Sequence, residues 1–270
     1  MERRQFIKGM AATAAIACPT CLASVGAIAS EKTANGAVRA KAHGKVHWSY
    51  EGAEGPGKWG ELSPSFRVCD LGVQQSPIDI KNDISSVLDD IDVQYKSRIP
   101  LRVVNNGHTI QVNTKPGSQI SIGGKRYKLL QFHFHHPSEH LLNGKTYQME
   151  AHFVHAADDG QLAVLGVFLN PGRENALLSQ VWNAIPAEAG PDEMGGSTLI
   201  SPADLLPVDK KYFRYHGSLT TPPCSEIVLW SVFRTPLEVS IDQIRTFANL
   251  FPMNARPAQR LNRRFLLKSL

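Results

Sequence analysis

The sequence of 270 residues lacks the features that mark several large classes of protein. It contains no repeating unit, which excludes solenoid and propeller folds. Its 21 glycines and 17 prolines are ordinary amounts for this length, which excludes a collagen-like or low-complexity chain. The net charge of +5 comes from scattered residues, and we interpret one basic cluster near the C-terminus as a solvated surface rather than a nucleic-acid-binding one. A hydrophobic content of 42% is enough to build a sizeable core.

A long uncharged stretch, from Gly9 to Ser30, follows the pair Arg3-Arg4 at the N-terminus. This order is typical of a twin-arginine export signal, and the small residues around Ala29 predict cleavage after it. An uncleaved membrane anchor is the alternative, because the stretch is about long enough to span a bilayer. We therefore predict an export signal over 1–29, a flexible leader over 30–45 and a catalytic domain over 46–270. The mature protein is expected in the periplasm or outside the cell, without stable membrane insertion.

The chain has only four cysteines, and their placement agrees with export. Cys18 and Cys21 lie in the signal, which leaves Cys69 and Cys224 in the mature chain. An even pair in an oxidising compartment predicts a disulfide, with two buried thiols as the alternative.

Short apolar or alternating runs separated by turn residues predict a mainly β domain. Two pairs of runs read as hairpins: 120–122 with 125–135 across Gly123-Gly124, and 149–155 with 162–169. A further pair of runs, 101–104 and 109–112, flanks 105–107. A further buried run covers 226–233. Helical spacing of apolar residues predicts helices over 175–185 and 240–251, the second with a capping box of Ser240 and Gln243. The predicted fold is mainly β with minor α, a single domain on a large twisted, mostly antiparallel sheet with short surface helices.

Six of the ten histidines lie between His133 and His155. His133 and His135 are two residues apart in one predicted strand, so both imidazoles share a face. His152 lies in the next long strand, and if the two strands are neighbours the three rings converge. Three neutral nitrogen ligands would leave a tetrahedral zinc ion with one open position, as in catalytic sites. Scattered strand histidines with structural roles are the alternative.

Polar residues that would orient these rings are also visible. Gln131 lies on the face of His133, and Glu150 lies on the face of His152. An oxygen that accepts the spare ring N–H would aim the other nitrogen at a metal. We assign structural or surface roles to the three remaining histidines of this region, His136, His140 and His155.

These segments together resemble the alpha-class carbonic anhydrases. The resemblance is carried by 131–135 (QFHFH), 138–140 (SEH), 150–155 (EAHFVH) and 218–223 (SLTTPP), with further matches at 47–50, 75–80, 105–108 and 254–259. It covers nearly the whole mature chain, and the family fold is a large, mostly antiparallel sheet. In one departure, His136 follows the second ligand position, where many family members have tryptophan.

The resemblance implies a role for each matching residue. His133, His135 and His152 look like the zinc ligands, and Cys69 and Cys224 match the bridged positions of exported members. Thr220, with Glu139 behind it, resembles the pair that orients zinc-bound hydroxide. His108, which from the residues alone is equally a turn residue after 105–107, resembles the proton shuttle. The residues that look like the substrate pocket are Val154, Val164, Leu219, Thr221 and Trp230.

The implied activity is zinc-dependent, reversible hydration of carbon dioxide to bicarbonate and a proton, with weak esterase activity as a natural side reaction. A zinc ester hydrolase and a non-catalytic binding module on the same fold are the alternatives. The chain has neither a Gly-x-Ser-x-Gly elbow nor a His-Glu-x-x-His helix, so other familiar hydrolase signatures are absent. The expected partners are the small substrates, carbon dioxide and bicarbonate. A homodimer is also compatible with the sequence.

Overall fold

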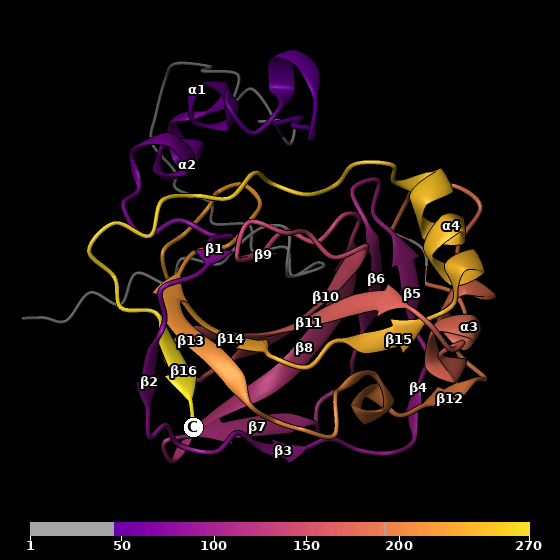
Figure 1. Ribbon diagram of the computed structural model, residues 1–270. Coiled ribbons are helices and arrows are strands. Elements are labelled where there is room, and N and C mark those ends of the chain that lie inside the picture. Colours follow the sequence, from indigo (N-terminus) through magenta and orange to yellow (C-terminus); the bar gives the residue numbers. More distant parts are fainter. Residues whose placement is uncertain (1–45, 192) are drawn as a thin grey trace, which may run out of the picture. The chain divides into compact units, whose positions relative to one another are not determined.

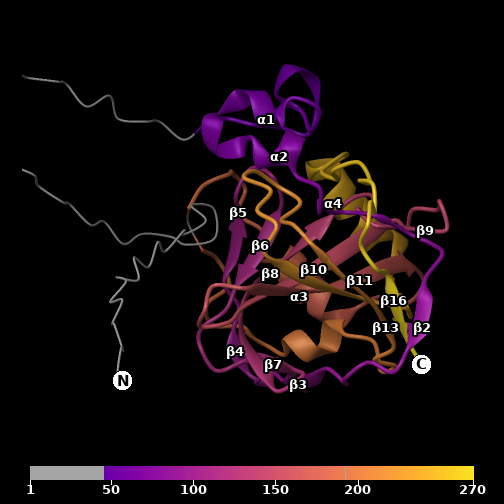
Figure 2. The ribbon, with the colours of Figure 1, turned by 90° about the vertical axis from the view of Figure 1, so that its left-hand side faces the viewer.

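The computed structural model describes residues 46–191 and 193–270, which form a twelve-stranded sheet accompanied by short helices (Figures 1 and 2). The strands of the sheet are β2 (Ile84–Ser86), β3 (Asp92–Gln94), β5 (Val103–Asn105), β6 (Ile110–Asn113), β7 (Gln119–Ile122), β8 (Lys125–His135), β10 (Met149–Ala156), β11 (Leu162–Pro171), β13 (Tyr212–Gly217), β14 (Val228–Phe233), β15 (Leu237–Val239) and β16 (Leu267–Ser269). Two small ladders pair β1 (Asp79–Ile80) with β9 (Leu141–Leu142) and β4 (Ile99–Pro100) with β12 (Leu199–Ile200).

The main path through the sheet runs β2-β16-β13-β14-β11-β10-β8-β6-β5. Most neighbours are antiparallel, whereas β11 pairs in parallel with β14 and β15, and β16 pairs in parallel with β2. The helices are α1 (Trp59–Leu62), α2 (Val68–Leu71), α3 (Ala176–Trp182) and α4 (Ile241–Leu250), with single 3₁₀ turns at Gly52–Glu54, Pro64–Phe66 and Pro202–Leu205. The prediction of a mainly β fold on one large sheet is confirmed.

The predicted hairpins form where their turn residues place them. β7 and β8 pair across Gly123 and Gly124, which have φ values of +55° and +78°. These left-handed conformations suit glycine, because it has no Cβ to clash. β10 and β11 pair across the turn that ends at Gly160, with φ +85°. These hairpins position the long strands that carry the histidines.

The core lies on the face of β8 opposite its histidines. Phe132 and Phe134 are fully buried there, and Phe132 stacks on Phe153 of β10 with ring centroids 5.1 Å apart. Burial of each such ring contributes roughly 1.5–3 kcal/mol. The period of two along each strand therefore assigns one face to packing and the other to chemistry.

The two predicted longer helices are present. Ser240 caps α4 through the predicted capping box with Gln243. α3 begins after Asn175, whose side chain accepts a hydrogen bond from Leu178 N–H, but it ends at Trp182 rather than at Ile185. Two i→i−3 backbone bonds, from Ala184 and Ile185, close its end, and the following proline disfavours a helical residue before it. In Figure 1 both helices lie at one side of the sheet.

The predicted disulfide is confirmed, because Cys69 and Cys224 are bonded with their Cα atoms 5.0 Å apart. The predicted export signal and leader lie outside the described residues, so their boundaries remain predictions. None of the helices in the described part combines the length and the apolar character needed to cross a bilayer.

Candidate metal centre

The three histidines expected to bind metal converge on one face of the sheet. β8 and β10 are antiparallel neighbours, and their register places His133 directly opposite His152. The ring centroids of His135 and His152 are 4.6 Å apart, and those of His133 and His135 are 5.0 Å apart. One ligand atom from each of the three rings lies within 4.8 Å of the others. The adjacency of strands on which the sequence prediction depended is therefore correct.

The second nitrogen of each ring is held by a hydrogen-bond partner. His133 Nδ1 lies 2.8 Å from Gln131 Oε1, and His152 Nε2 lies 2.8 Å from Glu150 Oε1, as the shared faces predict. His135 Nδ1 donates to the backbone oxygen of Asn254 at 2.7 Å, a partner that sequence reasoning missed. With these nitrogens engaged, His133 Nε2, His135 Nε2 and His152 Nδ1 are left for a common ligand.

Electrostatics favours the neutral, metal-binding state of two of the three rings. Burial lowers the pKa of His133 well below its usual value, and the neighbouring His135 and His152 lower it further. Burial also lowers the pKa of His135, against the opposing effect of Glu139. A neutral imidazole offers the lone pair that a metal ion needs. Burial alone would lower the pKa of His152, but Glu150 raises it.

Two unsatisfied buried atoms lie where the three rings converge. His135 Nε2 and Glu139 Oε2 are buried and lack a hydrogen-bond partner among the described residues. Glu139 Oε2 lies 3.5 Å from His135 Nε2 and 3.7 Å from His152 Nδ1. Buried polar atoms are costly when unpaired; a bound ion would give His135 Nε2 a partner, whereas Glu139 Oε2 can accept from a hydrogen-bond donor at the same point. Three nitrogen donors are a ligand set that suits zinc.

A buried network supports His152 from behind. Glu150 Oε1 lies 2.8 Å from both His152 Nε2 and His140 Nδ1, and His140 Nε2 lies 2.7 Å from the Tyr215 hydroxyl. Burial alone would raise the pKa of Glu150, but His140 and His152 hold it well below its usual value. The carboxylate is therefore ionised and can fix the orientation of both rings.

Two members of this network carry no signal in the sequence. Tyr215 is 75 residues from His140, and nothing in the pattern of β13 marks it. Gly166 lies opposite His152, and a Cβ there would come within 2.9 Å of Glu150 Oε1. Glycine is needed here because a side chain would clash with Glu150, and not because the backbone adopts a left-handed conformation.

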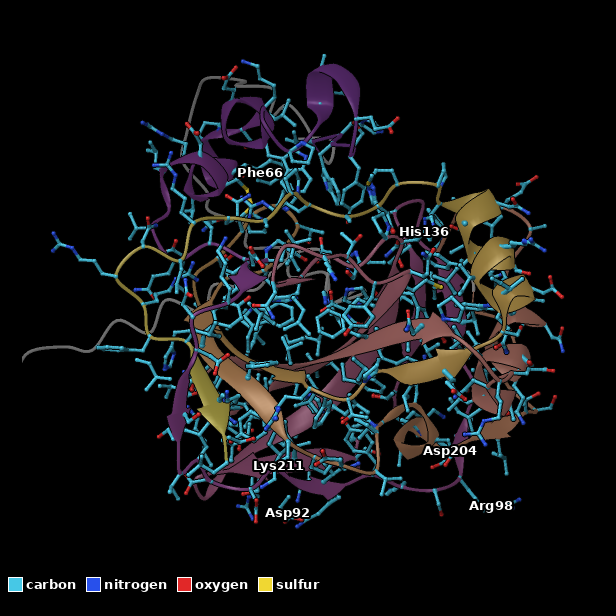
Figure 3. All side chains as sticks on the ribbon, in the orientation of Figure 1. Phe66, Asp92, Arg98, His136, Asp204 and Lys211 are labelled. Carbon is cyan, nitrogen blue, oxygen red and sulfur yellow. A yellow bond between two sulfur atoms is a disulfide. The ribbon has the colours of Figure 1, made fainter. Side chains whose placement is uncertain are left out.

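The other histidines of the region differ in their surroundings. His140 is fully buried in the network described above, which bears out a structural role. His155 is fully buried, with Nε2 2.6 Å from the Tyr95 hydroxyl and Nδ1 3.1 Å from Ala163 O. His136 is half-buried near the end of α4, where its Nδ1 lies 3.0 Å from Pro252 O (Figure 3).

The predicted apolar pocket residues are also brought together. Val154, Val164 and Trp230 are in register across β10, β11 and β14. Val154 follows His152 by two residues, so this row continues the face that carries the predicted metal ligands. Leu219, also buried, belongs to the loop that contains Thr220 and Thr221.

The loop of Thr220 is fixed at both ends. Trp230 Nε1 donates to Ser218 O at 3.0 Å, and Cys224 N–H donates to Thr221 O at 2.9 Å. Thr220 itself is buried. Within the described part of the chain, Glu139 accepts a bond from the backbone N–H of Arg256, and no hydrogen bond joins it to Thr220. The expected pairing of Thr220 with Glu139 therefore remains a prediction.

His108 stands on an aromatic platform. Its ring stacks on Trp48 with centroids 3.8 Å apart and planes 7° apart. Burial lowers its pKa, and the nearby His47 lowers it further. Asn254 Nδ2 donates to His108 O at 3.0 Å, so the residue whose backbone oxygen holds His135 also holds the turn of His108. The sequence identified His108 but not Trp48 or Asn254.

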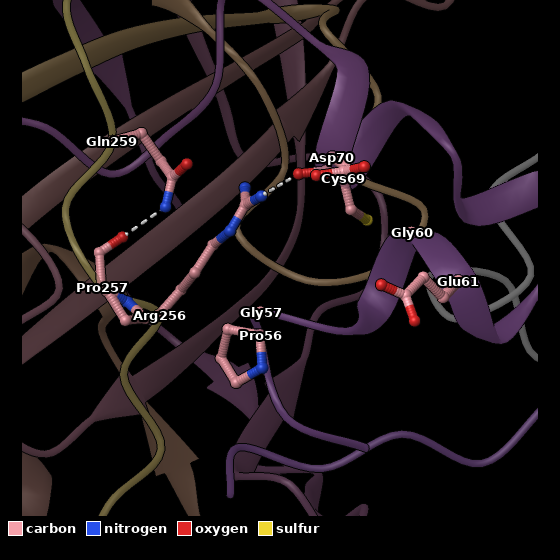
Figure 4. A pocket seen from close by; sticks show the side chains of 9 residues that line it. All are labelled: Pro56, Gly57, Gly60, Glu61, Cys69, Asp70, Arg256, Pro257 and Gln259. Atoms are coloured by element: carbon pink, nitrogen blue, oxygen red, sulfur yellow. Dashed lines mark hydrogen bonds between the residues drawn. The ribbon is translucent and has the colours of Figure 1, made fainter. Parts of the chain in front are cut away.

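Arg256 connects the disulfide to the centre. Its backbone N–H donates to Glu139 Oε1, while its guanidinium donates to Gln75 Oε1 and to Cys69 O. The side chain is almost fully buried and lines a pocket of about 250 Å³ beside Cys69 (Figure 4). The interpretation of the basic cluster near the C-terminus as a solvated surface is therefore wrong for Arg256, because its side chain is buried and held by these hydrogen bonds.

Comparisons with known proteins agree with this geometry. The family model described as eukaryotic-type carbonic anhydrase matches residues 54–269. The chain is 45% identical over 229 residues to a carbonic anhydrase of Nostoc sp., covering 83% of this chain and 87% of that protein. It is 43% identical over 235 residues to one of Neisseria gonorrhoeae, with coverage of 86% and 92%. The solved alpha-carbonic anhydrase of Thermovibrio ammonificans, in complex with the inhibitor sulfanilamide, superposes with a TM-score of 0.80 at 46% identity, covering 83% of this chain and all of that one.

Proposed function

The chain belongs to the alpha-class carbonic anhydrases, lyases that hydrate carbon dioxide reversibly, and we propose that His133, His135 and His152 hold the zinc ion of this reaction. The observation that carries the proposal is the convergence of three ring nitrogens within 4.8 Å, each on a ring whose other nitrogen is engaged. When bound, zinc supplies a Lewis acid that lowers the pKa of water to about 7.

The protein's first contribution is to hold the three rings before any ligand arrives. Gln131, Glu150 and the backbone of Asn254 fix their orientation, and the burial of Glu150 keeps solvent from competing for its hydrogen bonds. Loss of such supporting partners commonly weakens metal affinity about 10- to 100-fold.

Thr220 and Glu139 are proposed to orient the attacking oxygen. Glu139 is fixed through Oε1 by the Arg256 N–H, which leaves Oε2 free to accept a proton donor such as the Thr220 hydroxyl. Once its proton is committed to Glu139, the Thr220 oxygen acts only as an acceptor. It would then select one orientation of the attacking water, and orientation of this kind is a large part of catalysis.

The row Val154–Val164–Trp230, with Leu219 and Thr221 beside it, is proposed to hold carbon dioxide. These strand side chains are buried and their apolar surfaces adjoin His152 on the same face. An uncharged substrate needs no charged group for binding, and an apolar wall excludes water from the reacting carbon.

His108 is proposed to carry the released proton to the buffer. Its lowered pKa keeps the ring neutral at pH 7, so it is ready to accept a proton. The stack on Trp48 positions the ring without using either nitrogen, so both remain available for proton transfer.

Stopped-flow hydration of purified mature protein, with and without a zinc chelator, tests the proposal together with metal analysis. We expect His152→Ala to lose most zinc and nearly all activity, because one of three donors is removed. The matched control is His216→Ala, since His216 is exposed, and this variant should keep both. Full zinc with no hydration in the wild type would instead support a binding module, and an active, zinc-replete His152→Ala would remove His152 from the ligand set.

We also propose that the protein is exported, with the twin-arginine route as the predicted path. The disulfide between Cys69 and Cys224 supports this, because such bonds persist in oxidising compartments. The homodimer remains a prediction that sedimentation velocity would test.

A further inference from the structure

A basic and apolar surface lies on the side of the molecule where β2 forms the edge of the sheet. Two segments, 73–86 and 259–269, run side by side there (Figures 1 and 2). Ile78 bridges in parallel to Gln259, Asn262 Nδ2 donates to Val73 O, and β2 pairs with β16. Six exposed residues of these segments, of the adjoining α2 and of the residue that precedes α2 define what we call the arginine surface: Arg67, Leu71, Val73, Arg260, Arg263 and Phe265.

The apolar members of this surface stand out into solvent. The exposed fractions of Phe265, Leu71 and Val73 are 73%, 64% and 61%, and Ile84, half exposed, lies beside Phe265 through its bond to Leu266 O. Single exposed apolar residues are ordinary, but several on one surface mark a place of interaction.

The charges of the arginine surface are not balanced. In the described part of the chain, Arg67, Arg260 and Arg263 form no ion pair. The neighbouring carboxylates of Asp79 and Asp83 are paired with Lys81 and Lys268.

Two further carboxylates lie close by, and one of them is also engaged. Glu226 accepts bonds from Gln74 N–H and from the Gln75 amide. This leaves the negative charge of Asp70, exposed on α2, to oppose the positive charges of the three arginines. The surface therefore carries an excess of positive charge.

The loop that presents two of these arginines is braced. Arg264 donates to the backbone oxygens of Arg260, Leu261 and His216, and its guanidinium lies over the ring of Tyr215 at 5.4 Å. Arg264 thus stabilises the loop, whereas the side chains of Arg260 and Arg263 are exposed and can contact a partner.

We propose that the arginine surface docks the protein on anionic phospholipid bilayers. Arginines that meet lipid phosphates, with apolar side chains between them that enter the headgroup region, are the combination that peripheral binding requires. A second copy of the chain fits poorly, because a symmetric contact would bring like charges together. Binding through this surface is independent of the reaction at the metal centre.

Co-sedimentation of the full mature, zinc-loaded protein with vesicles tests the proposal. We expect binding to vesicles of phosphatidylcholine mixed with phosphatidylglycerol, no binding to phosphatidylcholine alone, and release by salt. Arg260→Gln/Arg263→Gln should lower the partition coefficient about 25-fold, since each arginine contributes about five-fold near an anionic surface. Leu71→Ser/Phe265→Ser should also weaken binding, whereas Val208→Ser, at a fully exposed valine elsewhere, should not.

The matched control for charge is Arg98→Gln/Arg126→Gln, which removes the same charge from two exposed arginines that form no ion pair with the residues the structure describes. In Figure 3 Arg98 lies at the lower right, whereas Phe66, the neighbour of Arg67, lies in the upper part of the view. This control should bind like the wild type, and all variants should retain hydration activity. Absence of binding at low salt, or an equal loss in the control, would overturn the proposal. A change of sedimentation coefficient in the Arg260/Arg263 variant would overturn it in favour of a second copy.

Discussion

His155 should make the protein less stable in acid by an amount that can be worked out from its surroundings. Its ring is fully buried, Nδ1 donates to Ala163 O, and Nε2 accepts from the Tyr95 hydroxyl. Burial lowers its pKa to about 4, and backbone oxygens of Ala163 and Phe153 offset this only in part. In the unfolded chain the same ring has a pKa of about 6.5.

The sign follows from which state binds the proton. Between pH 6.5 and 4 the unfolded chain is protonated at this ring and the folded protein is not, so the free energy of unfolding falls as the pH falls. The gap of about 2.5 between the two pKa values corresponds to about 3.4 kcal/mol once the pH is below both. At pH 5 the same relation gives a loss of about 2 kcal/mol relative to pH 8.

Urea unfolding of the wild type and of His155→Gln at pH 8 and pH 5 measures this effect. Glutamine keeps a donor and an acceptor but does not titrate, so every other ionisable group contributes equally to both proteins. Both are kept in the same zinc buffer, so loss of metal is also common to them. We expect the variant to be less stable at pH 8, and the difference to shrink by about 2 kcal/mol at pH 5.

The matched substitution is His216→Gln, which makes the same exchange at a histidine that is exposed rather than buried. A difference for His155→Gln that is the same at both pH values would show that the buried ring is not held neutral, and would refute the reasoning.

Three further predictions concern the reaction and the disulfide. Thr220→Ala should keep its zinc but lose about 100-fold in kcat/KM, because the attacking oxygen loses its orienting partner; stopped-flow hydration at wild-type speed would contradict this. His108→Ala should lower kcat in dilute buffer and spare kcat/KM, and added imidazole should restore kcat; a deficit indifferent to imidazole would exclude His108 as the shuttle. Cys69→Ser/Cys224→Ser should lower the free energy of unfolding by up to about 5 kcal/mol, because the bond closes a loop of 155 residues, and urea unfolding of the oxidised wild type gives the reference.

Local pattern was sufficient for much of the fold and for the shared face of the histidines proposed as metal ligands. The period of two along β8 places His133 and His135 on one face and Phe132 and Phe134 on the other, whatever the rest of the chain does. The glycines at 123, 124 and 160 end their strands in tight turns, so β7 with β8, and β10 with β11, are paired by short-range chemistry. The face of Glu150 and His152 follows from the same period.

Tertiary structure alone decided which groups complete the centre. The carbonyl of Asn254 reaches His135 across 119 residues, and Tyr215 reaches His140 across 75. Trp48 lies beneath His108, and Gly166 leaves room for Glu150. None of these pairings follows a local period, because each depends on the order of strands in the sheet and on the path of a loop. The alternation of side chains follows from local backbone geometry and holds in every strand. The distance between two residues far apart in the sequence is set only when the whole sheet has formed.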